Sequence, residues 1–138
     1  MCDRMTRWTA SLAFAIALLA SAVSAHHSIA GYYDESRRVS LDGIVTQFQF
    51  VNPHPFLFID VKDGDRTAPW RLEMDNRGEL VDVGMSAQTF RPGDRVVVNG
   101  SPARTQPQML YIRRLDRPAD GFSYEQVGFS PKIRQPSR

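Results

Sequence analysis

The chain has 138 residues, 17 basic and 15 acidic side chains, and a formal net charge of +2. So small a net charge produces no strong electrostatic field, and nucleic acid is therefore not expected as a partner. The single cysteine, Cys2, cannot form an intramolecular disulfide. A disulfide-stapled domain is thus excluded, and core packing, helped at most by a bound metal, has to stabilise the fold.

The N-terminal segment, residues 1–25, has the composition of a secretory signal peptide. Arg4 and Arg7 supply its positive start, and residues 12–20 form an apolar run much shorter than the roughly 20 residues that span a bilayer. Small residues at 21–25 are suited to cleavage, whereas an uncleaved anchor is the alternative. We therefore expect a periplasmic or secreted protein with no membrane span after cleavage and no lipid anchor.

Five strand-like segments and one helical segment follow the signal peptide. The first strand, 39–50, is expected to bury Ile44, Phe48 and Phe50 on one face, because these residues recur at even spacing. The helical segment lies within 76–90, begins with an asparagine and has apolar residues at helical spacing. The other predicted strands cover residues 56–61, 69–74, 95–100 and 108–115.

The order of these elements predicts an all-β fold. Three strands, a short helix and two more strands are typical of an OB-type barrel, in which the helix lies between strands three and four. We therefore predict a small five-stranded OB-like barrel over 26–116, and a small open β-sandwich or roll is the alternative. Residues 117–138 are rich in proline, glycine and charge, and are expected to form a loosely ordered tail.

Three histidines are the candidate metal ligands. His26 and His27 directly follow the predicted cleavage site, and His54 lies in the turn 52–55. Imidazole and terminal-amine nitrogens suit Cu(II), Zn(II) and Ni(II), and Cu(II) binds most tightly among these ions. The sequence therefore predicts a transition-metal site, with copper as the favoured metal. The alternative is an ordinary solvated N-terminus and a histidine that serves only in a turn.

The cleavage position decides which metal motif the N-terminus forms. Cleavage after Ala25, favoured by the small residues Val23 and Ala25, makes His26 the first residue, so that its amine and imidazole can chelate one ion. Cleavage after Ser24 places a histidine third, in the amino-terminal Cu(II)/Ni(II) motif, and cleavage after Ala22 creates neither arrangement. Because amines and imidazoles lose their protons at about pH 8 and about pH 6.5, binding is expected to weaken below about pH 6.

His54 is the residue expected to complete a site at the N-terminus. Pro53 and Pro55 restrict the backbone on both sides of it. If residues 26–36 run back antiparallel to the first predicted strand, the start of that segment faces the region 50–54. A rigid loop histidine would then oppose the chelating terminus.

Five short motifs are spaced along the chain. They are Ala25–Ser28 (AHHS), Gly43–Val45 (GIV), Asn52–His54 (NPH), Trp70–Glu73 (WRLE) and Pro92–Asp94 (PGD). As a set they resemble a family of small exported bacterial proteins known only as a domain of unknown function, and the resemblance spans about residues 25 to 115. It implies the barrel fold and a pairing of the two histidine positions. It implies no reaction, because the family has no established activity.

Glu73 is the carboxylate of the Trp-x-x-Glu motif and is expected on the outward face of the third predicted strand. It is a candidate for an outer residue that supports the metal ligands, and an exposed carboxylate near Arg71 is the alternative. Tyr32 and Tyr33 are expected to pack rather than to bind metal. No catalytic residue is predicted, because Ser28 has neither an acid partner nor a Gly-x-Ser-x-Gly elbow.

Two functions follow from these patterns. The first is an exported β-barrel that binds a transition metal, most simply Cu(II), through His26, His27 and His54, with Glu73 in support. The alternative is a non-enzymatic module that holds a protein or glycan partner in the cell envelope, in which case the histidines are incidental.

Overall fold

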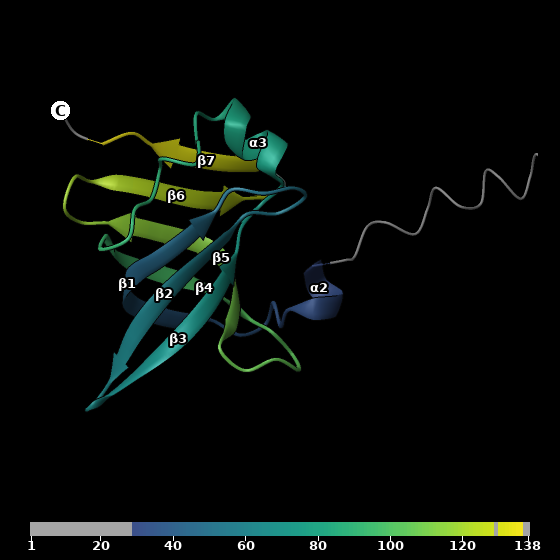
Figure 1. Cartoon of the computed structure of the whole chain (residues 1–138). Coiled ribbons are helices and arrows are strands. Elements are labelled where there is room, and N and C mark those ends of the chain that lie inside the picture. The colour runs from purple at the N-terminus through teal and green to yellow at the C-terminus, as the bar shows by residue number, and fades with distance from the viewer. Residues whose placement is uncertain (1–28, 129, 137–138) are drawn as a thin grey trace, which may run out of the picture. The chain divides into compact units, whose positions relative to one another are not determined.

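The computed structural model describes residues 29–128 and 130–136 (Figure 1). The chain divides after Gly31 into two units. The predicted signal peptide, 1–25, lies outside the described residues. The first described element is the short helix α2, Ile29–Tyr32. No helix in the described ranges is long and apolar enough to cross a membrane.

The second unit contains the strands and the helix predicted from the sequence, together with two more strands. Their bounds are β1 Val39–Gln49, β2 Phe56–Asp63, β3 Arg66–Glu73, α3 Arg77–Asp82, β4 Arg95–Pro102, β5 Met109–Arg117, β6 Phe122–Val127 and β7 Ser130–Arg134. The helix begins where its asparagine predicted, because the Asn76 side chain accepts a hydrogen bond of 2.8 Å from the Gly78 amide. It ends well before residue 90, and Gly84 follows with a φ of +97°.

Strands β1 to β5 close into a barrel (Figure 1). Their order is β3-β2-β1-β4-β5, and β3 pairs with β5 in parallel. That closing contact is short and joins residues 71–73 to residues 109–111. The predicted five-stranded OB-like barrel with its helix between strands three and four is thus confirmed. An open sandwich or roll is excluded, because the β3–β5 pairing leaves the barrel strands no open edge at this seam.

The C-terminal segment differs from the predicted loose tail. β6 pairs with residues 114–117 of β5, and β7 pairs with β6. This edge of β5 is available because β3 covers only residues 109–111 of it. Phe122 and Tyr124 of β6 are buried in the core. The prediction from the proline- and charge-rich composition is therefore wrong for this segment. Pairing with the free edge of β5 and burial of two aromatic rings order it.

Burial along β1 also departs from the prediction at one residue. Ile44, expected inside, is 43% exposed, whereas Leu41 and Val45 are buried. A bulge between Val45 and Gln47 shifts the register, so the alternation changes phase and Phe48 still packs against the core.

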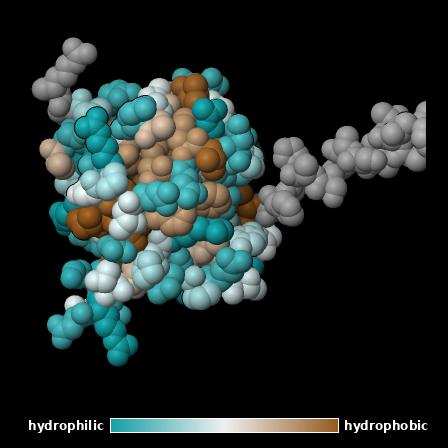
Figure 2. All heavy atoms as spheres, in the orientation of Figure 1, coloured by the Kyte–Doolittle hydropathy of each residue, from teal (hydrophilic) through white to brown (hydrophobic). Residues whose placement is uncertain are grey.

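The barrel interior is filled by apolar side chains from all five barrel strands and α3. Its fully buried members include Leu57, Ile59, Leu72, Leu80, Val98, Leu110 and Ile112. On the viewed surface, hydrophobic and hydrophilic residues are interspersed (Figure 2). The core therefore fills the interior of the barrel. A functional site would have to lie at the ends of the barrel or on its outer face.

Candidate functional site

The loop between β1 and β2 holds His54 in a well-defined position. Its Asn52–Pro53 peptide bond is cis. The Arg77 amide donates to the Pro53 carbonyl at 2.9 Å, and the Met74 amide donates to the Pro55 carbonyl at 3.0 Å. Backbone amides just after β3 and at the start of α3 therefore hold the loop by hydrogen bonds on both sides of His54.

The hydrogen bond of the His54 ring decides which of its nitrogens is available. Nδ1 lies 3.0 Å from the Met74 carbonyl oxygen. A carbonyl only accepts, so in this contact Nδ1 carries the proton, and a neutral ring then has a lone pair on Nε2. The side chain remains 31% exposed. A histidine that donates one ring N–H to a carbonyl while its other nitrogen faces a metal is the common arrangement in metal sites.

Glu73 lies beside this histidine. Its Oε1 is 3.8 Å from His54 Nδ1, and its side chain is 17% exposed. The Tyr33 hydroxyl donates to Glu73 Oε2 at 2.5 Å. Burial raises the pKa of the Tyr33 phenol well above its ordinary value, and the hydrogen bond to Glu73 is the second cause. The phenol therefore stays neutral and remains a donor. We call Tyr33, His54 and Glu73 the open cluster.

The chain reaches Glu73 by a route that differs from the predicted one. Tyr33 forms an isolated antiparallel bridge with Ala103, and the Asp34 amide donates to the Pro102 carbonyl at 2.8 Å. Residues 33 and 34 thus lie beside the end of β4, not along β1. The antiparallel arrangement with β1 that was assumed from the sequence is therefore not found at Tyr33 and Asp34, whose backbone contacts are with residues 102 and 103.

A second carboxylate cluster, which the sequence did not indicate, lies just beyond the end of β3. Asp75 is only 7% exposed. It accepts hydrogen bonds from the Tyr111 hydroxyl and, at 2.8 Å, from the Tyr124 hydroxyl. Burial comes first among the causes that raise the pKa of both tyrosines, and Asp75 adds to it. We call these three residues the closed cluster. Because its members are far apart in the chain, no local spacing could have revealed it.

The structure thus brings together two of the four predicted site residues. His54 and Glu73 are adjacent, whereas His26 and His27 lie outside the described residues. Within the described ranges, no group of three or more histidine, cysteine or acidic side chains is placed to hold a metal ion. The open cluster therefore offers an imidazole and a carboxylate, and further ligands would have to come from another part of the chain.

Comparison with known proteins gives a family but no activity. The sequence matches the model of a family of unknown function, DUF6152, over residues 14–109. No curated protein matches it. Similar solved structures include a ZRD-deleted mutant of TiaS in complex with agmatine (22% identity, 73% of this chain, 25% of that chain, TM-score 0.45). Another is apo TiaS, a tRNAIle2 agmatidine synthetase (21% identity, 67% of this chain, 24% of that chain, TM-score 0.42). The chain spans about a quarter of the length of these proteins.

Proposed function

We propose that this chain, which belongs to the DUF6152 family of unknown function, binds a transition metal, most simply Cu(II). The ligands are His54 and the N-terminal histidines His26 and His27, with Glu73 as the supporting carboxylate. One observation carries the proposal: the Met74 carbonyl engages Nδ1 of His54, and this leaves Nε2 as the metal-binding nitrogen.

The neighbourhood of His54 supports a cation at this place. Glu73 brings a carboxylate to within 3.8 Å of the ring, and Tyr33 holds that carboxylate by a hydrogen bond. Because Glu73 lies on the Nδ1 side of the ring, it supports the histidine from outside the ligand set, and its negative charge lowers the cost of bringing a divalent ion to Nε2. The two residues come from separate motifs, the Asn-Pro-His turn and the Trp-x-x-Glu strand.

The length of the N-terminal segment permits the remaining ligands to reach this site. His26 precedes Tyr33 by seven residues; helix α2 within this stretch rises about 1.5 Å per residue, and an extended chain covers at most about 3.3–3.6 Å per residue. Tyr33 itself contacts Glu73. The tether is therefore long enough for the amine and imidazole of a terminal His26 to approach His54.

The proposed role is metal binding or delivery in the periplasm or outside the cell. Nitrogen ligands at a chain terminus can bind and release copper as protonation changes, because each must shed a proton to coordinate. We propose no reaction.

Copper titration of the processed protein tests the proposal. Mass spectrometry first establishes that the chain begins at His26, since a residual methionine or tag would block the amine. We expect one Cu(II) per chain and at least about a tenfold loss of affinity in His54→Ala. Glu125→Gln is a matched control for Glu73→Gln, because Glu125 is an exposed carboxylate on β6. It should leave copper affinity unchanged.

The same titration can overturn the proposal. Absence of tight binding in a chain that begins at His26 removes it. So does an affinity that is the same in His54→Ala and in the parent chain, because the loop histidine would then contribute nothing.

A further inference from the structure

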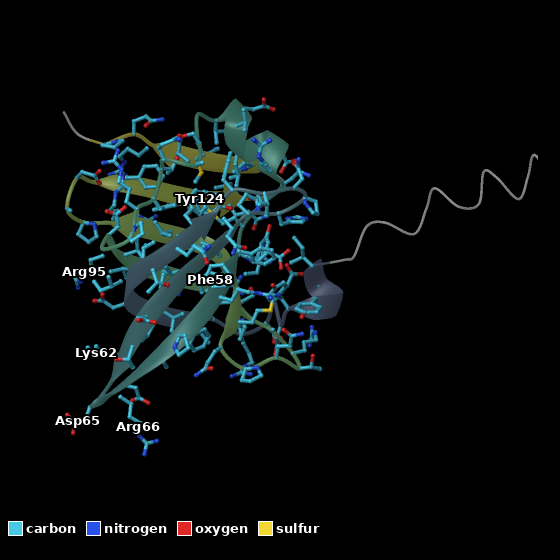
Figure 3. The ribbon with its side chains drawn as sticks, viewed as in Figure 1. Phe58, Lys62, Asp65, Arg66, Arg95 and Tyr124 are labelled. Carbon is cyan, nitrogen blue, oxygen red and sulfur yellow. The ribbon has the colours of Figure 1, made fainter. Side chains whose placement is uncertain are left out.

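An open hollow of about 300 Å³ lies on the outer face of the barrel, where β2 and β3 run side by side. Phe58, which lines it, is labelled in Figure 3. The volume is at the lower end of the range in which small-molecule sites occur. Its lining residues are Thr46, Phe58, Ile59, Pro69, Trp70, Arg71, Pro107 and Gln108.

The strand register explains why an aromatic ring and a cation meet in this hollow. Phe58 of β2 lies directly opposite Arg71 of β3. Their neighbours Leu57 and Leu72 are a second opposed pair and are fully buried in the barrel. Since side chains alternate between the faces of a strand, Phe58 and Arg71 both project from the outer face.

Arg71 is held in place but has no acidic partner among the residues that the structure describes. Its guanidinium lies over the Phe56 ring, 4.7 Å from the centroid, and Nη2 is 3.4 Å from the sulfur of Met109. None of the ion pairs formed within the described ranges involves Arg71. Stacking on the Phe56 ring orients the planar guanidinium, and the Met109 thioether is only a weak hydrogen-bond acceptor. Most of the N–H donors of Arg71 are therefore available for a bidentate interaction with a carboxylate.

Gln108 completes the polar side of the hollow from an unusual backbone conformation. Its φ is +55°, and it alone among the described non-glycine residues has a positive φ. The Arg71 amide donates to its carbonyl at 2.9 Å, which fastens this residue to β3. A left-handed backbone is costly for glutamine, and such residues are concentrated at functional sites. Its amide adds donors and an acceptor beside the aromatic wall, and the Thr46 hydroxyl, which donates to the Phe58 carbonyl at 3.3 Å, adds an acceptor.

We propose that this hollow binds an anionic saccharide, such as a uronic acid unit of a glycan. The apolar face of a sugar ring fits against Phe58, its carboxylate pairs with Arg71, and its hydroxyls pair with Gln108 and Thr46, whereas Trp70 packs toward the core beneath the hollow. This combination of one aromatic wall, one unpaired guanidinium and neutral polar groups matches such a ligand group by group. The β2–β3 face is also where barrels of this architecture bind oligosaccharides and oligonucleotides.

Other occupants fit the same surface less well. Nucleic acid needs several cations along its phosphates, and Arg71 is the single cation in the lining. A peptide that adds as a strand needs an open sheet edge that can donate hydrogen bonds. Both sides of β2 are paired, and the part of β3 that β5 leaves uncovered contains Pro69, which has no N–H to donate. A saccharide requires neither feature.

Titration with three small sugars tests the proposal without reference to metal. Glucuronate, glucuronamide and glucose are titrated into the processed chain in the presence of EDTA, and two-dimensional NMR follows the Arg71 side chain and the Trp70 indole. We expect glucuronate to bind about tenfold more tightly than its neutral amide. In Arg71→Gln this preference should disappear. Gln108→Asn should retain the backbone conformation, because asparagine tolerates a positive φ. Its shorter side chain should weaken the binding of all three sugars.

Arg66→Gln is the matched control, because it removes the same charge from the same strand. Arg66 is exposed at the tip of the β2–β3 hairpin, far along the strand from Phe58 (Figure 3). It should retain the preference for glucuronate. Circular dichroism checks that both arginine variants are folded.

Several results overturn the proposal. One is equal binding of glucuronate and glucuronamide, and another is a preference that Arg71→Gln retains. Binding of oligothymidylate or a proline-rich peptide at these residues, with no response to glucuronate, would overturn it as well. Because EDTA removes metal ions, failure here is distinct from failure of the copper titration.

Discussion

The open cluster and the closed cluster use the same chemistry two residues apart. In each, a carboxylate at or just beyond the end of β3 accepts hydrogen bonds from buried tyrosine hydroxyls. Asp75 is satisfied by two tyrosines and is 7% exposed. The Glu73 side chain has one tyrosine, a histidine at 3.8 Å and 17% exposure. The first carboxylate has no room for a ligand, whereas the second keeps an oxygen beside an available imidazole.

This difference separates structure from function more clearly than residue type does. A carboxylate saturated by internal donors contributes to stability, because its removal leaves buried hydroxyls without partners. A carboxylate that is only half-satisfied contributes less to stability and retains affinity for a cation. Substitution of Asp75 should therefore lower stability and leave metal affinity unchanged. Substitution of Glu73 should lower metal affinity and change stability little.

The largest expected effect is on stability, in Asp75→Ala. It leaves the Tyr111 and Tyr124 hydroxyls buried without an acceptor, at about 1–3 kcal/mol each, so unfolding should become easier by about 2–6 kcal/mol. Urea unfolding measures this loss, and copper affinity should not change. Glu73→Ala is the control and should cost clearly less stability. Equal losses in the two variants would erase the distinction between the clusters.

The closed cluster should also make the fold sensitive to alkali. The pKa values of Tyr111 and Tyr124 are raised in the folded state, as is that of Tyr33 in the open cluster, so two of the three contributing tyrosines belong to the closed cluster. An unfolded tyrosine ionises near pH 10. The contribution of these tyrosines is fully present below about pH 10 and is lost as the pH rises further, by about 1.4 kcal/mol per pH unit for each tyrosine. Urea unfolding at pH 9, 10 and 11 measures this slope. A stability that is flat across this interval would contradict the assignment.

The open cluster should show its effect in metal binding. Glu73→Gln retains the shape of the side chain but removes its charge, so copper affinity should fall by about 10–100-fold. Unfolding free energy should change by about 1 kcal/mol or less, because the amide oxygen can still accept from Tyr33. If the substitution destabilises the fold as much as Asp75→Ala does, Glu73 is a structural residue like its neighbour.

The smallest expected effect is that of Tyr33→Phe. It removes one hydrogen bond to Glu73 while retaining the packing of the ring against Tyr111, so stability should fall by about 1 kcal/mol. Copper affinity should fall less than in Glu73→Gln, since Tyr33 only positions the carboxylate. Tyr124→Phe is the comparison in the closed cluster, and it should leave copper affinity untouched.

Local pattern predicted the barrel because each barrel element carries its own signal. Strand alternation, the Pro-Gly-Asp turn before β4 and the Asn76 cap of α3 each depend on residues close in sequence. The failures occurred where a distant contact overrides that signal. The β1 bulge reverses the phase that placed Ile44 inside, and β6 pairs with the free edge of β5 in a tail that was predicted to be only loosely ordered.

The candidate site divides in the same way. Residue type and motif singled out His54 and Glu73, and their adjacency was expected only loosely. Tyr33 was assigned to packing, although its hydroxyl also orders Glu73. Asp75, Tyr111 and Tyr124 form hydrogen bonds across 36 and 49 residues of chain, and no periodicity within a strand encodes such a meeting.

The sequence alone determined the class of fold, the order of the barrel elements and the scarcity of metal ligands, because composition and short-range spacing are properties of the chain. Only the tertiary structure decided which carboxylate is closed and which is open, and which nitrogen of His54 is available. Those properties depend on burial and on hydrogen-bond partners, which exist only after closure of the barrel brings the end of β3 against β5 and the segment at Tyr33.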